Sequence, residues 1–190
     1  YGAMAVHTEA LLRTRDGAAA LAAVHRTQEL VARPDFSLAT DLDVMGFRAR
    51  PHYAELARFG QDAAFLAVAE AAEADRPGRV AEGARLASAW KAHVLLGDLA
   101  ERGAAALDPL VAVERHLQPG ELLVEFAEGG ERLYAYVHGD GPARVYDLGR
   151  RCEVAEQARA YGELLADPLG RAGPAQVAEA GRALYERLLA

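Results

Sequence analysis

The chain has 190 residues, which suffices for one ordinary domain or for two small ones. Its composition is 52% hydrophobic, so a packed core is expected and long disorder is not, and no apolar run reaches the ~20 residues that cross a bilayer. A formal net charge of -7 without a basic patch disfavours nucleic acid as a partner. The single cysteine excludes an internal disulfide and a cysteine-based zinc site, and it fits a reducing cytoplasm.

Alanine-rich segments with three- and four-residue apolar spacing occupy most of residues 1–117. This spacing predicts helices that stack as antiparallel pairs, because alanine lets neighbouring backbones approach closely. The strict tetratricopeptide pattern is missing, so any repeat is degenerate and only TPR-like. Residues 1–4 are typical of a tag remnant before a cloned start. The predicted helices cover 4–32 with a break at Asp16-Gly17, 51–74, 79–102 and 109–117, with a short helical turn near 42–47.

The period of the apolar pattern changes to two after Pro119-Gly120, which predicts β-strands. Short glycine-containing connections at 128–131 and 139–142 are typical of hairpin turns, so we expect a three-stranded antiparallel meander. Three short strands bury little by themselves, and two following helices are expected to pack on them. The predicted fold is α+β, with a helical-repeat-like region over 1–117 and a second unit over 118–190. The strands are expected at 122–126, 133–138 and 143–148, and the helices at 151–166 and 174–189.

The residues around the meander also carry a family resemblance. Leu117–Phe126 has a leucine and a Pro-Gly turn before a strand of the form Leu-Leu-x-acid-aromatic, and Ala183–Leu189 contains a Leu-Tyr pair followed by Leu-Leu. Both segments resemble parts of the CHAT domain, a caspase-like, separase-related cysteine peptidase domain associated with tetratricopeptide-like repeats. The other similar segments are Arg132–Val137 and Val145–Gly149, which resemble its second and third strands, and Ala64–Glu70 and Trp90–Ala100, which resemble the preceding repeat pair.

The resemblance implies that the chain is the N-terminal, non-catalytic part of a bacterial CHAT-type cysteine endopeptidase. In this family the catalytic His-Gly and Cys motifs lie on later strands of a caspase-like sheet, and we expect the chain to end at Ala190 before them. No catalytic residue is therefore carried over. The implied role is that of a cytoplasmic scaffold that positions the catalytic half and docks an activator or substrate protein.

His138-Gly139 and Cys152 are the residues most similar to a caspase-type pair, but they flank one predicted strand. A dyad requires hydrogen-bond contact, whereas an extended strand separates its ends by ~17 Å. We therefore interpret them as a hairpin residue and a thiol at a helix start, and the chain has no recognisable catalytic pair. No cofactor is expected, because the glycine pairs fit neither a dinucleotide fingerprint nor a P-loop. No metal site is expected either, since the remaining histidines lack metal-ligand spacing: His7, His25, His52, His93 and His116.

Tyr53, Phe59 and Trp90 are the candidate protein-binding residues, because helical-repeat modules often line a peptide groove with aromatic side chains. Core packing is the more common role for such residues. The competing hypothesis for the whole chain is a stand-alone helical adaptor with a β-hairpin cap and no enzymatic activity. A large exposed apolar patch near 122–148 would favour the CHAT interpretation, in which a neighbour covers it, and its absence would favour the adaptor.

Overall fold

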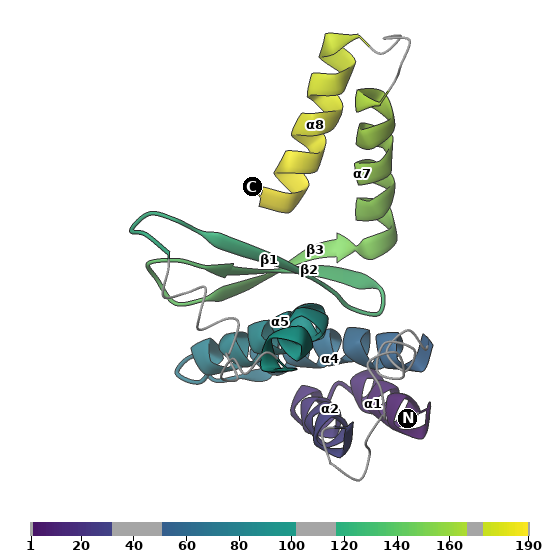
Figure 1. The fold of residues 1–190 in the computed structure, drawn as a ribbon, viewed down its shortest axis with the longest axis vertical. Helices are drawn as coiled ribbons and strands as arrows, with labels where there is room; N and C mark the ends of the chain where they lie inside the picture. Colours follow the sequence, from purple (N-terminus) through teal and green to yellow (C-terminus); the bar gives the residue numbers. More distant parts are fainter. Residues whose placement is uncertain (1, 32–50, 102–116, 167–172, 190) are drawn as a thin grey trace.

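The structure is a computed structural model that describes residues 2–31, 51–101, 117–166 and 173–189. Figure 1 shows a three-stranded sheet with helices stacked beneath one face and a helical hairpin that projects from the other side. The chain is therefore a mixed α+β protein. The described elements are α1 (Gly2–Arg13), α2 (Gly17–Val31), α4 (Pro51–Glu70), α5 (Arg76–Glu101), β1 (Leu123–Glu128), β2 (Arg132–His138), β3 (Arg144–Arg150), α7 (Arg151–Leu165) and α8 (Pro174–Leu189).

The helix break expected at Asp16-Gly17 is confirmed, since α1 ends at Arg13 and α2 begins at Gly17. One predicted boundary was wrong: residues 75–78 were expected to separate two helices, yet α5 already begins at Arg76. Proline lacks only a donor that the first helical turn leaves unpaired, so Pro77 fits in the first turn of α5 and does not end the previous helix. The turn predicted near 42–47 and the helix predicted at 109–117 lie outside the described residues, and the TPR-like repeat stays a prediction.

The lower layer of the molecule is an alanine-rich helical core. α2 and α4 pack together, α1 packs against both, and α5 packs against α4. Its larger buried side chains are Leu21, Val24, Leu56 and Leu86, and alanines at Ala20, Ala63, Ala64 and Ala67 fill the space between them. Because alanine methyls are short, these helices pack closely, as the composition predicts.

The meander predicted from the period-two pattern is confirmed, with β2 between β1 and β3 and antiparallel to both. A turn precedes it, in which the amide of Glu121 donates to the carbonyl of Gln118 at 2.9 Å and Gly120 has φ +83°. Proline in the second place and a positive-φ glycine in the third define a type II turn. A bulge near Gly149, with φ +93°, interrupts the regular pairing of β2 with β3.

The layer that covers one face of the sheet consists of α4 and α5. Tyr134 and Tyr136 of β2 are buried against these helices, and the ring of Tyr134 stacks on Phe65 with the centroids 4.8 Å apart. The phenol of Tyr136 lies over Gly83, where a Cβ atom would come within 2.6 Å of its oxygen. The two predicted units, 1–117 and 118–190, thus share one apolar cluster, made up of Val68, Val80, Ala84, Ala87, Ala127, Tyr134 and Tyr136.

The C-terminal helices cover less of the sheet than expected. α7 follows β3 directly, contacts β2 and β3, and buries one residue, Val154. α8 buries none of its residues and packs mainly on α7. Figure 1 shows why: both helices rise away from the sheet instead of lying across it.

Candidate functional site

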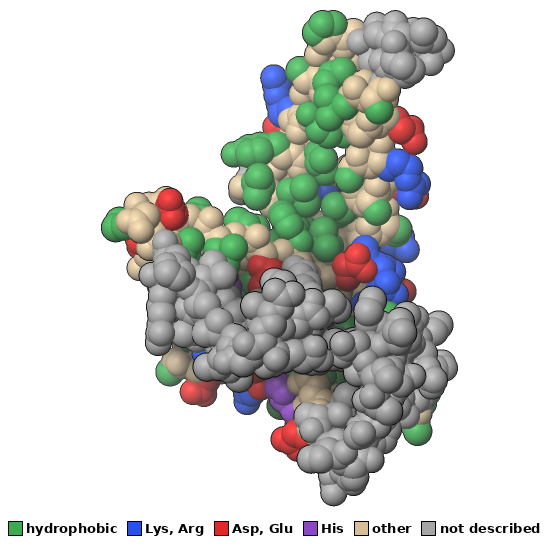
Figure 2. Space-filling model, viewed as in Figure 1, with side chains coloured by type: hydrophobic (Ala, Val, Ile, Leu, Met, Phe, Trp, Pro, Cys, Tyr) green, Lys and Arg blue, Asp and Glu red, His purple; other side chains and the backbone are tan. Residues whose placement is uncertain are grey.

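The hairpin formed by α7 and α8 carries an apolar surface that the described part of the chain leaves open. Leu165, Tyr185 and Leu189 are 60%, 58% and 54% exposed. Figure 2 shows apolar side chains gathered along the length of both helices. Large apolar side chains gathered on one surface of a soluble protein often mark a site where a partner binds. We use the name hairpin surface for a set of exposed and partly exposed apolar side chains on these two helices: Tyr161, Leu165, Leu184, Tyr185, Leu188 and Leu189.

The internal contacts of the hairpin hold this surface in place. The ring of Tyr161 packs over Gly181, where a Cβ would lie 3.1 Å from it. Arg187 of α8 donates to Glu153 of α7 at 2.7 Å and to the carbonyl oxygen of Leu148 in β3 at 3.3 Å. The bond from Arg187 lowers the pKa of the Glu153 carboxyl below its usual value. Arg187 therefore fixes the C-terminal end of α8 near the sheet.

The sheet face that points away from α4 and α5 adds to the apolar area. Phe126, Ala135 and Tyr146 are opposite one another on three neighbouring strands, so their side chains share one face. Phe126 is 36% exposed and Tyr146 is 45% exposed. Leu122, just before β1, is 67% exposed. Exposed apolar side chains are therefore present within 122–148, the region in which a large apolar patch would favour the CHAT interpretation.

A half-buried polar anchor joins the sheet to the helices at Asp62 of α4. One carboxylate oxygen accepts from the hydroxyl of Tyr134 at 2.7 Å, and the other accepts from the amide of Gly130 at 2.8 Å. Burial raises the pKa of the Asp62 carboxyl, although both hydrogen bonds and nearby Arg132 act in the opposite direction. Burial, followed by the charge of Asp62, also raises the pKa of the Tyr134 phenol far above its ordinary value.

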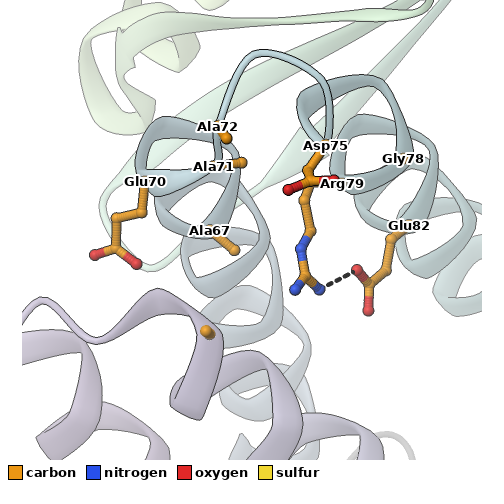
Figure 3. Close-up of a pocket in the computed structure, with 9 residues that line it drawn as sticks. Ala67, Glu70, Ala71, Ala72, Asp75, Gly78, Arg79 and Glu82 are labelled. Carbon is orange, nitrogen blue, oxygen red and sulfur yellow. Dashed lines mark hydrogen bonds and ion pairs between the residues drawn. The ribbon is translucent and has the colours of Figure 1, made fainter.

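An acidic cleft of about 550 Å³ opens where α4 ends and α5 begins, close to the start of α2. Figure 3 shows Glu70 on one side of the cleft and the joined pair Arg79 and Glu82 on the other. Glu70 accepts from the amide of Gly17 at 3.1 Å, and Glu82 is 2.8 Å from the imidazole of His25. These carboxylates therefore connect helices. The described residues hold no group of three side chains suited to a metal ion.

The three predicted binding residues are only partly visible. The side chains of Tyr53 and Trp90 lie outside the described residues. Phe59 is half-buried beneath the turn between β1 and β2, where a Cβ on Gly130 would lie 3.5 Å from its ring. A role for these three in binding a partner stays a prediction.

His138 and Cys152 lie at opposite ends of the β2–β3 hairpin. His138 is buried at the end of β2, whereas Cys152 is exposed in the first turn of α7. Arg150, next to α7, pairs with Arg132 at the other end of β2 from His138. The 7 residues of β2 span ~20 Å, so the thiol and the imidazole cannot form a catalytic dyad.

Comparisons with known proteins leave the family open: no protein-family model, no curated protein and no solved structure matches the chain. Among the described helices, none combines the length and the apolar character that crossing a bilayer requires. The principal candidate functional site is the hairpin surface together with the adjoining outer face of the sheet, because large apolar side chains are exposed on both.

Proposed function

We propose that this chain is the non-catalytic regulatory or scaffold portion of a bacterial CHAT-type, caspase-like cysteine endopeptidase. In this proposal the catalytic half of the peptidase binds the hairpin surface and the outer face of the sheet. The helices α1, α2, α4 and α5 form the TPR-like base on which an activator or substrate protein docks. The location is the cytoplasm.

The observation that supports the proposal most strongly is the exposure of α8. This helix has 16 residues and buries none, yet it carries Leu184, Tyr185, Leu188 and Leu189. Isolated helices of this length are marginal in water, and most helical stability in proteins comes from packing of an apolar face. Burying one large apolar side chain contributes ~1.5–3 kcal/mol, so a partner that covers this face gains a substantial free energy.

The sequence resemblance supplies the identity of the partner. Leu117–Phe126 forms the Pro-Gly turn and the first part of β1, and Ala183–Leu189 forms the end of α8. These are the segments that resemble the opening of a CHAT domain and the helix before its catalytic half. The cover expected for α8 is therefore a caspase-like sheet with the His-Gly and Cys motifs.

The competing hypothesis is a stand-alone helical adaptor without enzymatic activity. The buried cluster that α4 and α5 share with Tyr134 and Tyr136 supports it, because this part of the fold has its own core. In that case the hairpin surface receives an unrelated protein, and the aromatic residues Tyr53, Phe59 and Trp90 line a peptide groove.

The natural reading frame and the activity of its product test the proposal. We expect a His-Gly pair and a cysteine on predicted strands encoded after Ala190, and peptidase activity that the substitution of that cysteine by alanine abolishes. The double variant Leu165→Glu/Tyr185→Glu is expected to lower this activity at least ~100-fold, since it places two charges in the interface. Arg159→Glu, at an exposed position on α7 outside the hairpin surface, is the control and should leave activity unchanged.

Two results would contradict the proposal. One is a natural protein without any downstream or separately encoded His-Gly and Cys segment, which would favour the adaptor. The other is full peptidase activity in the double variant together with a native circular dichroism spectrum, which would show that the hairpin surface does not contact the catalytic half.

A further inference from the structure

Two apolar surfaces of the chain adjoin each other where β3 passes into α7. One is the hairpin surface on the projecting pair of helices, and the other is the outer face of the sheet, which points away from α4 and α5 (Figure 1). The exposed large side chains are Leu165, Tyr185 and Leu189 on the hairpin and Phe126 and Tyr146 on the sheet. A projecting arm and an open face of the same apolar character can cover each other when they come from two molecules.

The contacts of the hairpin hold it away from the outer face of its own sheet. α7 follows β3 without a loop, and Val154 is buried near its start. Arg187 connects the C-terminal end of α8 to the carbonyl oxygen of Leu148 and to Glu153. Laying the hairpin across its own sheet would break these contacts of Arg187. The hairpin of a second molecule meets no such restriction.

The charges beside the two surfaces are complementary. The exposed charged residues of the described hairpin are four acids and two arginines: Glu156, Glu163, Glu179, Glu186, Arg159 and Arg182. The outer face carries the exposed Arg144, which lies opposite Val137. The acid of that face, Glu128, is already paired with Arg58 and Arg151. A hairpin therefore matches a sheet face in charge, whereas two hairpins side by side would bring mostly acids together.

The exposed apolar area has the size that a specific dimer buries. Six large side chains of the two surfaces are between 36% and 67% exposed: Leu122, Phe126, Tyr146, Leu165, Tyr185 and Leu189. An aromatic side chain buries ~150–250 Å² and a leucine somewhat less, so these six expose on the order of 500 Å² per chain. Homodimer interfaces are ~65% apolar, so the corresponding interface covers ~800 Å² of each copy, which is the standard size of a specific complex.

We propose that the chain forms a twofold-symmetric homodimer in which the hairpin of each copy lies on the outer face of the other copy's sheet. A twofold axis generates both contacts at once, because each copy gives its hairpin and receives the hairpin of its partner. The pairing deepens the proposed function, since the second copy takes the surfaces assigned there to the catalytic half. Only the competition between the two occupants rests on that function, and it requires the dimer to separate before the catalytic half binds.

Sedimentation equilibrium of this chain over a range of concentrations measures the pairing. We expect a dissociation constant of about 10 µM, the weak end for interfaces of this size. At concentrations well below this value the chain is a monomer, in which α8 is uncovered and exchanges its amide protons rapidly. In the dimer the exchange of α8 should slow as the concentration of the chain rises.

Variants of the two surfaces test each side of the contact. Leu165→Glu/Tyr185→Glu on the hairpin and Tyr146→Glu on the sheet should each weaken the dimer at least ~10-fold, because each places charge in an apolar interface. Arg144→Glu should weaken it several-fold by placing an acid against the acidic hairpin. Arg76→Glu, at an exposed position in the first turn of α5, is the matched control for charge and should dimerise as the parent does. If Tyr146→Glu fails to fold, Arg144→Glu still decides the result.

A spin label at the tip of the hairpin locates the contact directly. The label is attached to Glu163→Cys in a Cys152→Ser background, and this chain is mixed with an unlabelled, ¹⁵N-enriched parent. We expect broadening of the amide signals of Phe126 and Tyr146 in the ¹⁵N-enriched copy. A label at Val6→Cys on α1, in the same background, is the control and should leave these signals unchanged.

Three results would overturn the pairing. They are a chain that stays monomeric up to about 200 µM, well above the expected constant, sheet variants that dimerise as the parent does, and broadening confined to α7 and α8, which would indicate hairpin-to-hairpin packing. Each concerns this chain alone, so each leaves the proposed function standing. A natural protein without a catalytic segment would instead refute that function and leave the pairing untouched.

Discussion

The substitution Asp62→Ala tests whether the polar anchor holds the sheet on α4. It removes the acceptor of the Tyr134 hydroxyl and of the Gly130 amide, which Asp62 binds at 2.7 and 2.8 Å. Tyr134 is only 2% exposed, so water cannot easily replace the lost partner. Each buried donor left unpaired costs ~1–3 kcal/mol, and removal of a desolvated carboxylate offsets part of this. We expect a loss of about 2–4 kcal/mol in the free energy of unfolding.

The assay is urea unfolding followed by far-ultraviolet circular dichroism, with Asp62→Asn as the matched control. The asparagine carbonyl can accept from the Gly130 amide while its NH₂ group donates to the Tyr134 oxygen, so a loss below ~1 kcal/mol is expected. The Ala variant should unfold ~1–2 M urea earlier than the parent, given a typical dependence of ~1–3 kcal/mol per molar. Equal midpoints for the Ala variant and the parent would refute the anchoring role.

The remaining predictions concern pH, packing and the hairpin. Burial raises the pKa of Asp62, so the folded state holds the carboxyl proton more tightly than the unfolded state does. The parent should therefore lose stability relative to Asp62→Asn as pH rises from the ordinary pKa of 3.8 through the raised pKa. Urea midpoints across pH 3–7 measure this, and parallel pH profiles for the two proteins would contradict it. Gly83→Ala should lower the free energy of unfolding by about 1–3 kcal/mol in thermal or urea unfolding, because the new Cβ would lie 2.6 Å from the Tyr136 oxygen. Gly78→Ala is the control, and it should be neutral or slightly stabilising because the space around Gly78 is open. Arg187→Ala should reduce the helical circular dichroism signal and speed amide exchange of α8, whereas the control Arg182→Ala should do neither. Equal circular dichroism spectra for the two variants would show that the contacts of Arg187 to Glu153 and Leu148 do not hold the helix.

The local features of the fold could be predicted from the sequence. The break between α1 and α2 follows from Asp16-Gly17, and the meander follows from the change to a period of two after Gly120. Both depend on neighbouring residues, whose turn and pattern preferences are strong. The start of α5 was missed, because Asp75-Arg76-Pro77-Gly78 fits a helix end as well as a helix start.

The packing of the sheet on α4 and α5 could not be predicted in the same way. Tyr134 and Tyr136 alternate with Leu133, Ala135 and Val137, so both faces of β2 are apolar enough to be buried. The pattern fixes which residues share a face but leaves open which face the helices cover.

The polar partners on α4 were likewise missed. Gln61 and Asp62 form contacts with residues about 70 positions further along the chain, and no local spacing connects them. The available signal was the presence of two adjacent polar residues on a helix that is otherwise rich in alanine.

Hydrogen exchange of the α8 amides, compared between this chain and the intact natural protein, tests the docking claim most directly. In this chain α8 has no buried residue, so its amides should exchange rapidly through local opening. The proposed function predicts that a catalytic half of the natural protein covers the hairpin surface. Burial of two or more large side chains at ~1.5–3 kcal/mol each then predicts protection at least ~100-fold greater. Equal exchange rates for α8 in both proteins would contradict the account.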